Sequence, residues 1–239
     1  MAIVLPFVFI SCNDDKDEPV ADDHEYVDLG LPSGTLWATC NVGANTPEEF
    51  GDYFAWGETT PKDFYDWSNY RWGHWKWDTI SDHFYHVEVT WYKYYSENRT
   101  NSGSVDGDRK TELDPEDDAA YVNWGSRWRM PTLEQFQELL DKCKWQWTKR
   151  NSAKGHLVTG PNGNSIFLPA SGGYVDKLYN DNVCGYYWSR TRCSPDKLTL
   201  EASGQGDAYI LFLDYSRNEV WYDSRYDGST VRAVCVKKK

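Results

Sequence analysis

The second half of the sequence consists of short apolar segments separated by turn residues, and this pattern limits the fold more than any other feature. Glycine, proline and asparagine are concentrated between the segments, as in GPNGN at 160–164 and SGG at 171–173. Turn residues at such close intervals are typical of short antiparallel strands. We expect strands at 145–150, 156–159, 165–168, 185–190, 208–213, 220–223 and 230–236.

The first half predicts a hairpin and three helix starts. Apolar runs at 26–31 and 35–40 flank a Pro-Ser-Gly turn, which predicts the hairpin. A capping oxygen precedes a proline at both 46–49 and 114–117, and 132–135 fits a capping box. Apolar residues recur at helical spacing after the last of these, which predicts an amphipathic helix. Helices followed by many strands indicate an α+β fold. No repeat or low-complexity linker interrupts 26–239, so we expect one domain there.

The first twelve residues, MAIVLPFVFISC, are uncharged and almost wholly apolar. This run is too short to span a bilayer, but it suits the apolar core of a secretory signal. Its end resembles the lipobox of bacterial lipoproteins, which implies a signal peptide at 1–11 and a lipid on Cys12. The absence of Lys and Arg before Cys12 departs from that pattern. The alternative is a buried apolar strand followed by a loop cysteine.

Residues 13–25 carry seven acidic residues and one lysine. Like charges repel and little apolar surface is present, so we expect 12–25 to be an anchor cysteine with an extended acidic tether. An acidic stretch after a lipid-bearing cysteine also resembles an export signal to the outer face of the outer membrane. The predicted location is therefore the outer membrane, as a lipoprotein at the cell surface.

The overall charge and the aromatic content narrow the class of protein. Acidic residues outnumber basic ones 37 to 25, for a net charge of −12, which disfavours nucleic acid as a partner. The 13 Trp, 17 Tyr and 9 Phe are too much apolar surface to stay in water, so the chain must fold.

Five cysteines follow Cys12, and an oxidising compartment would permit disulfides between them. Cys40 with Cys235, and Cys184 with Cys193, are two candidate pairings, although spacing alone cannot fix the connectivity. An odd number leaves at least one thiol outside any pairing within the chain. No Cys-x-x-Cys pair occurs, so we expect no zinc site.

A set of motifs follows one another in a fixed order along the folded region. The motifs are EYVDLGLPSGTLWATCNVGA at 25–44, GDYFAWGE at 51–58, LDPEDDAA at 113–120, WRMPT at 128–132, IFLPA at 166–170, YWS at 187–189 and STVRAVC at 229–235. In this order they resemble the Fibrobacter succinogenes major paralogous domain family, which is common in surface proteins of gut anaerobes. The resemblance covers 26–236 and implies a C-type-lectin-like fold, similar to formylglycine-generating enzyme domains, with the N- and C-terminal strands adjacent.

Catalytic motifs are missing from the sequence. It contains no nucleophile elbow, phosphate-binding loop or complete dinucleotide motif. The formylglycine-generating resemblance would require a reactive cysteine pair late in the chain, and no closely spaced pair follows Trp188. We therefore expect no catalysis and no cofactor, with a formylglycine-generating or other oxidoreductase as the alternative. Acidic residues at 106–112 and 114–118 leave a structural calcium open, although a helix start alone would explain the second group.

Aromatic residues interleaved with polar ones form two candidate binding surfaces. Sugar rings offer flat C–H faces to aromatic planes while their hydroxyls need polar neighbours, and the same mixture suits protein partners. The alternative for each surface is that its rings pack a core. The late segments at 186–190 and 215–227 supply the candidate ligand-binding residues Trp188, Arg190, Trp221, Tyr222, Asp223, Arg225 and Tyr226. Between Tyr53 and Tyr95 lie 16 of the aromatic residues, including a second candidate patch of Trp72, Trp75 and Trp77.

The sequence therefore predicts a non-catalytic module that binds a glycan or a partner protein at the cell surface. It is anchored in the outer membrane through lipidated Cys12, and the late loops contact the ligand. Besides the enzyme, a structural subunit of a surface assembly or pilus is an alternative that predicts self-association.

Overall fold

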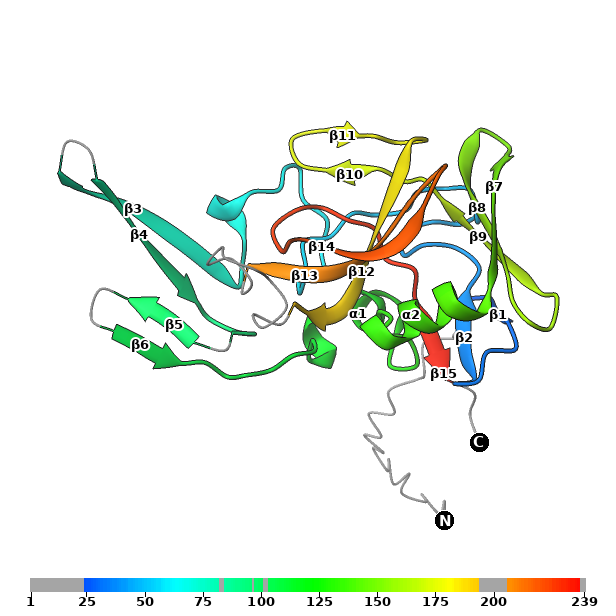
Figure 1. Cartoon of the computed structure of the whole chain (residues 1–239), viewed down its shortest axis with the longest axis horizontal. Helices are drawn as coiled ribbons and strands as arrows, with labels where there is room; N and C mark the ends of the chain where they lie inside the picture. Colours follow the sequence, from blue (N-terminus) through cyan, green and yellow to red (C-terminus); the bar gives the residue numbers. More distant parts are fainter. Residues whose placement is uncertain (1–23, 82–83, 96, 101–102, 194–205, 237–239) are drawn as a thin grey trace, which may run out of the picture.

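The computed structural model describes residues 24–81, 84–95, 97–100, 103–193 and 206–236 (Figure 1). Within them the fold is α+β and rich in antiparallel sheet, which confirms the predicted class. The helical elements are η1 (Trp67–Asn69), η2 (Pro115–Asp117), α1 (Ala119–Trp124) and α2 (Leu133–Lys142).

Most strands belong to three antiparallel sheets of three strands each. The sheets contain β1 (Tyr26–Asp28), β2 (Thr35–Ala38) and β15 (Val234–Val236); β7 (Lys144–Arg150), β8 (Ala153–Thr159) and β9 (Ser165–Pro169); and β12 (Cys184–Arg192), β13 (Asp207–Asp214) and β14 (Asn218–Ser224).

The predicted strands of the second half are confirmed, with bounds that move by one to four residues. The first sheet also confirms that the N- and C-terminal strands are adjacent. Val234 of β15 pairs with Trp37 of β2, and Trp37 pairs with Val27 of β1.

Two of the three predicted helix starts are correct. Thr132 caps α2, since its side chain accepts from the backbone N–H of Gln135 and the Gln135 side chain accepts in return. The segment at 114–117 forms η2, and Asp118 then caps α1. The prediction at 46–49 is wrong, because the chain makes only a turn there. The N–H of Glu49 donates to the carbonyl of Thr46, and the backbone reverses at Gly51, where φ is 77°.

Three hairpins were not predicted from the sequence. They are β3 (Gly73–Ser81) with β4 (Phe84–Trp91), β5 (Glu97–Thr100) with β6 (Gly103–Asp106), and β10 (Gly173–Tyr174) with β11 (Leu178–Tyr179). The first two extend from one side of the molecule, away from α1 and α2 (Figure 1).

The sheet of β12, β13 and β14 separates two hydrophobic clusters. Alternate residues of a strand point to opposite faces, so Trp188 and Ile210 join one cluster while Tyr187 and Leu211 join the other. Trp188 pairs with Ile210, which pairs in turn with Trp221 of β14. Among the described residues, no helix is long and apolar enough to cross a membrane.

No disulfide joins the five described cysteines, which corrects both candidate pairings. Cys184 pairs with Asp214 and the N–H of Cys193 donates to the carbonyl of Asp207, so the two cysteines lie at opposite ends of β13, about 20 Å or more apart. Cys235 faces Leu36 across the first sheet, whereas Cys40 lies beyond the end of β2. A disulfide needs Cα atoms within about 7 Å, so neither pair can be bridged without moving the backbone.

Candidate functional site

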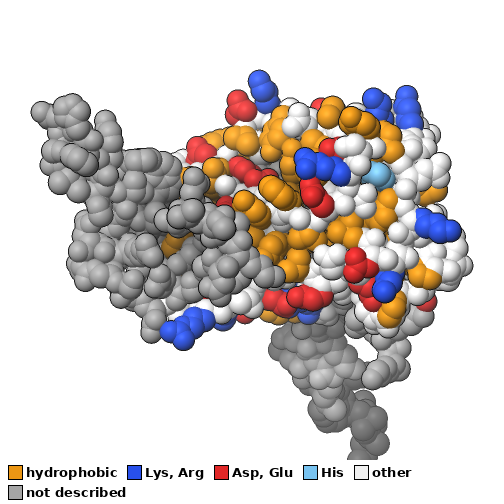
Figure 2. Space-filling view, viewed as in Figure 1, with side chains coloured by type: hydrophobic (Ala, Val, Ile, Leu, Met, Phe, Trp, Pro, Cys, Tyr) orange, Lys and Arg blue, Asp and Glu red, His pale blue; other side chains and the backbone are white. Residues whose placement is uncertain are grey.

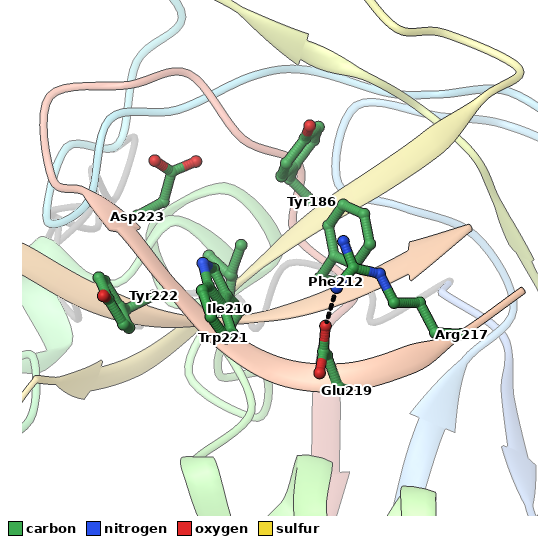
Figure 3. Close-up of a pocket in the computed structure, with 8 residues that line it drawn as sticks. All are labelled: Tyr186, Ile210, Phe212, Arg217, Glu219, Trp221, Tyr222 and Asp223. Carbon is green, nitrogen blue, oxygen red and sulfur yellow. Dashed lines mark hydrogen bonds and ion pairs between the residues drawn. The ribbon is translucent and has the colours of Figure 1, made fainter.

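The outer part of the β12–β14 sheet carries a cavity of about 270 Å³, which we call the β14 cavity. Hydrophobic side chains gather across the middle of the face shown in Figure 2, with acidic and basic side chains among them. The residues that line the cavity come from all three strands and the turn before β14 (Figure 3). They are Tyr186, Ile210, Phe212, Arg217, Glu219, Trp221, Tyr222 and Asp223.

Strand register explains why these residues meet. Tyr186 pairs with Phe212, and Phe212 pairs with Glu219, so one row of side chains crosses the sheet. Trp221 and Asp223 follow Glu219 at alternate positions of β14 and therefore share its face. The Tyr186 and Phe212 rings lie 5.5 Å apart in an edge-to-face arrangement. The floor of the cavity is therefore aromatic and its outer wall carries charge.

Two aromatic rings on β14 are open to solvent. Trp221 is 51% exposed and Tyr222 36% exposed, although both are large and apolar. Their ring centroids lie 5.2 Å apart with the planes only 9° from parallel. Figure 3 shows the two side chains next to each other along the strand. The pair therefore presents aromatic surface at the edge of the cavity.

Arg217 is held in place over the opposite part of the cavity. Its guanidinium lies 4.7 Å from the centroid of the Phe212 ring. It donates to Glu219 Oε1 at 2.7 Å, the contact drawn in Figure 3, and to Asp214 Oδ2 at 3.4 Å. Because these contacts exist without a ligand, the Arg217 side chain loses less conformational entropy when a ligand binds.

Asp223 belongs to a group of three partly or wholly buried carboxyl groups. Its side chain hydrogen-bonds to that of Asp227, and its Oδ1 accepts from the N–H of Ser224 at 2.9 Å. Burial and the nearby charge of Asp223 raise the pKa of Asp227 to about 8. Burial raises the pKa of Asp207 to about 6, against the opposing effect of Arg225. At neutral pH the Asp223–Asp227 pair therefore shares one proton and carries about one negative charge.

Of the seven late residues predicted to bind a ligand, three line this cavity: Trp221, Tyr222 and Asp223. Sequence reasoning missed Ile210 and Phe212, which come from a segment read only as a core strand. Tyr186, Arg217 and Glu219 lie in the segments that the aromatic-polar composition singled out, and strand alternation relative to Trp221 would have selected Glu219.

Trp188 and Arg225 are corrections, because both are fully buried. The indole N–H of Trp188 donates to the carbonyl of Phe54 at 2.7 Å. The guanidinium of Arg225 lies 4.8 Å from the ring centroid of Trp56 and donates to the carbonyl of Tyr94 at 2.7 Å. Neither side chain can touch a ligand at the surface, so both serve the core.

Arg190 and Tyr226 also lie outside the cavity lining. Arg190 forms an ion pair with Glu112 at 2.5 Å. The Tyr226 ring packs against Trp67, with the ring centroids 4.9 Å apart, at the edge of a third buried cluster. Each has a partner within the protein, and the structure does not bring either one to Trp221.

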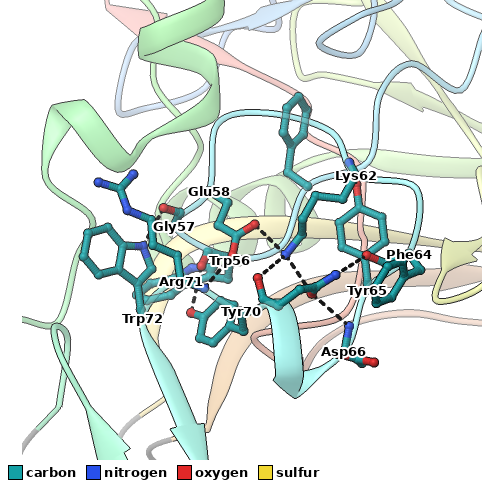
Figure 4. Close-up of polar contacts among 12 residues, drawn as sticks. Trp56, Gly57, Glu58, Lys62, Phe64, Tyr65, Asp66, Tyr70, Arg71 and Trp72 are labelled. Atoms are coloured by element: carbon teal, nitrogen blue, oxygen red, sulfur yellow. Dashed lines mark hydrogen bonds and ion pairs between the residues drawn. The ribbon is translucent and has the colours of Figure 1, made fainter.

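Within the second candidate patch, only Trp72 has a described side chain. Figure 4 shows Trp72 held against the preceding loop, where its indole N–H donates to the carbonyl of Gly57 at 2.6 Å. The guanidinium of Arg71 covers its ring at 4.3 Å. Trp75 and Trp77 lie in β3, opposite Val89 and Val87 of β4, and their side chains fall outside the described part of the structure.

An acidic cluster next to η2 has the donor atoms for a cation, but a lysine already occupies it. Carboxylate oxygens of Asp114, Glu116 and Asp117 lie within 4.8 Å of one another. The ammonium group of Lys93 pairs with Asp114, with Asp117 at 2.6 Å and with Glu116 at 3.6 Å. A metal ion bound here would have to displace this lysine. The carboxylate of Asp108 instead accepts from the N–H groups of Tyr94 and Tyr95.

Four of the five described thiols lack the environment of a reactive cysteine. Burial raises the pKa of Cys143 to about 11 and that of Cys193 to about 12, and it also raises the pKa of Cys40 and Cys184. A raised pKa leaves little thiolate at neutral pH. The lipid-anchor residue Cys12, the signal peptide and nearly all of the tether lie outside the described residues.

No family model, curated protein or solved structure matches this chain. The resemblance to the Fibrobacter succinogenes major paralogous domain family therefore stays a prediction from the motifs, and the site rests on its own geometry.

Proposed function

We propose that the chain is a non-catalytic binding module that recognises a glycan in the β14 cavity. The observation that carries this proposal is the exposed pair of Trp221 and Tyr222 beside a cavity lined by Arg217, Glu219 and Asp223. Aromatic planes stack on the C–H faces of sugar rings, and charged side chains hydrogen-bond sugar hydroxyls.

The size of the site favours a glycan over a partner protein. Stable protein interfaces bury about 800 Å² on each partner. The β14 cavity has a volume of about 270 Å³. This volume is close to about 300 Å³, the lower end of the range for small-molecule pockets. Such a volume suits one or two sugar rings, and a partner protein becomes an outcome of the test.

The cysteine environments support a non-catalytic role. A formylglycine-generating enzyme needs an activated thiol, whereas burial raises the pKa of Cys40, Cys143, Cys184 and Cys193. Labelling of the native protein with iodoacetamide, mapped by mass spectrometry, tests this point. Rapid labelling of any described cysteine would favour the oxidoreductase alternative. Self-association in sizing experiments would instead favour the structural subunit.

We further propose a C-type-lectin-like fold and a lipoprotein location at the cell surface. The adjacent terminal strands, two short α-helices and late antiparallel sheet support the fold. The location rests on the sequence around Cys12. Metabolic labelling with a fatty acid should modify the wild-type chain and not Cys12→Ser, and equal labelling of both would contradict the anchor.

A glycan array of the folded protein tests the proposed function. We expect a defined subset of glycans to bind, and Trp221→Ala and Tyr222→Ala each to weaken that binding about tenfold or more. Tyr215→Ala is the matched control, because Tyr215 is 76% exposed and does not line the cavity. Unchanged binding in both cavity variants would place the site elsewhere. An array without any bound glycan, together with capture of a protein, would favour the partner-protein alternative.

A further inference from the structure

The charges in the β14 cavity indicate which class of glycan it binds. This inference rests on the proposed function, because it assumes that the cavity binds a glycan. The cavity lining contains one cation, Arg217, and two acidic residues, Glu219 and Asp223. Arg217 already pairs with Glu219 at 2.7 Å and with Asp214 at 3.4 Å. Its positive charge is therefore balanced before any ligand arrives, and an anionic sugar would gain little from it.

The acidic side of the cavity lacks such a balance. Asp223 and Asp227 hydrogen-bond to each other, and Asp207 adds a third carboxyl group nearby. Within the described residues, neither Asp223 nor Asp227 has an ion pair with a lysine or arginine. The charge of Arg225 acts on Asp207 of this group, but its guanidinium is fully buried and donates to the carbonyls of Tyr94 and Asp207. The pair is therefore a hydrogen-bond acceptor without a matching cation.

The aromatic rings beside this pair favour the same ligand chemistry. Trp221 and Tyr222 are exposed, stacked on each other and adjacent in sequence to Asp223. An ammonium group is attracted to the face of an aromatic ring and donates charge-assisted hydrogen bonds to carboxylates. A sugar ring that carries an amine could use both features at once.

We propose that the β14 cavity binds an amino-sugar glycan, with the sugar ring on Trp221 and Tyr222 and its ammonium group donating to the Asp223–Asp227 pair. Neutral sugars bind more weakly because they lack the charge-assisted hydrogen bond. Acidic sugars bind weakest, because they place a second negative charge beside these carboxylates.

Titration calorimetry with three defined oligosaccharides tests the inference: a glucosamine tetramer, its fully N-acetylated form and a galacturonic acid tetramer. We expect wild type to bind the glucosamine tetramer at least about tenfold tighter than the acetylated form, and the galacturonate tetramer weakest. The double variant Asp223→Asn/Asp227→Asn should reduce the first ratio to about threefold or less, because it removes both carboxyl groups of the pair and leaves no carboxylate there to accept from the ammonium group. Asp176→Asn, at an exposed aspartate outside the cavity, should leave the ratio as in wild type.

The outcomes separate this inference from the proposed function. A ratio near one in wild type, a ratio that Asp223→Asn/Asp227→Asn does not change, or tightest binding of galacturonate overturns the amino-sugar preference. Glycans bound on the array with no affinity for the glucosamine tetramer also overturn it, while leaving glycan recognition intact. A lack of binding to every glycan overturns the proposed function itself. Thermal melts of both variants confirm that each remains folded.

Discussion

Two regions of this protein contain the same types of aromatic residue, but the rings are buried in one region and exposed in the other. Around Arg225, the rings of Trp56, Tyr70 and Tyr94 are buried, and the hydroxyl of Tyr70 donates to the carbonyl of Trp56. On β14, Trp221 and Tyr222 are exposed and stack on each other. Aromatic density alone therefore does not mark a binding surface. Rings whose polar atoms find partners inside the protein are core, and rings left outside are available to a ligand.

The two arginines show the same contrast. Arg225 lies between the rings of Trp56 and Trp91, at 4.8 and 5.0 Å, and burial lowers its pKa to about 10. Arg217 lies at a similar distance, 4.7 Å, from Phe212, but its side chain is 58% exposed. The arginine that stacks on aromatic rings is therefore part of the core in one region and accessible to a ligand in the other.

The largest effect is expected for removal of a buried ring. Trp188→Ala should lower the free energy of unfolding by about 3–5 kcal/mol, because it leaves a cavity between β12 and the Phe54 segment and removes a buried hydrogen bond. Urea unfolding of wild type and variant measures this loss. A change below about 1 kcal/mol would contradict the assignment of Trp188 to the core.

An intermediate effect on the free energy of unfolding is expected for replacement of Asp227. The pKa of Asp227 is raised to about 8, far above the about 3.9 of an unfolded aspartate, so its stabilising contribution is complete at low pH and is lost as the pH rises toward 8. Asp227→Asn removes that dependence. Relative to wild type, the variant should gain up to about 1.4 kcal/mol of stability for each pH unit between pH 5 and pH 8, because unfolded aspartate is ionised in this range while folded Asp227 keeps its proton.

Urea unfolding at both pH values checks this gain, with Asp176→Asn as the exposed control. A relative stability of Asp227→Asn that does not change with pH would show that the Asp223–Asp227 pair does not share a proton.

The smallest effect on stability is expected on the exposed side. Trp221→Ala and Arg217→Ala should each change the free energy of unfolding by no more than about 0.5–1 kcal/mol, because exposed rings and surface ion pairs contribute little. Thermal or urea unfolding measures the change. A loss comparable to that of Trp188→Ala would remove the distinction between the two regions.

The sequence predicted the architecture better than the site, and particular residues show why. The capping box at Thr132 produced α2 because an amphipathic run follows it. A similar signal at Thr46 produced only a turn because the chain reverses at Gly51 instead. A helix-capping signal therefore predicts a helix only where the residues that follow it also favour one.

The exposure of each aromatic residue depends on contacts that composition cannot show. Trp188 and Trp221 lie in one row across the sheet, with Ile210 between them. Trp188 is covered because the segment near Phe54 and the strand-like stretch at Thr230 hydrogen-bond to it. Trp221 lies on the edge strand β14. The segment near Phe54 is more than 130 residues away in sequence, so the difference appears only once the chain is folded.

Oxidation of tryptophan, mapped by mass spectrometry with and without the tightest-binding glycan of the array, shows directly whether β14 presents an open glycan-binding surface. We expect Trp221 to be oxidised rapidly in the protein alone and to be protected by the glycan, while Trp188 is unreactive in both samples. Oxidation of Trp221 at the same rate with the glycan bound, or slow oxidation of Trp221 in the protein alone, would contradict this expectation.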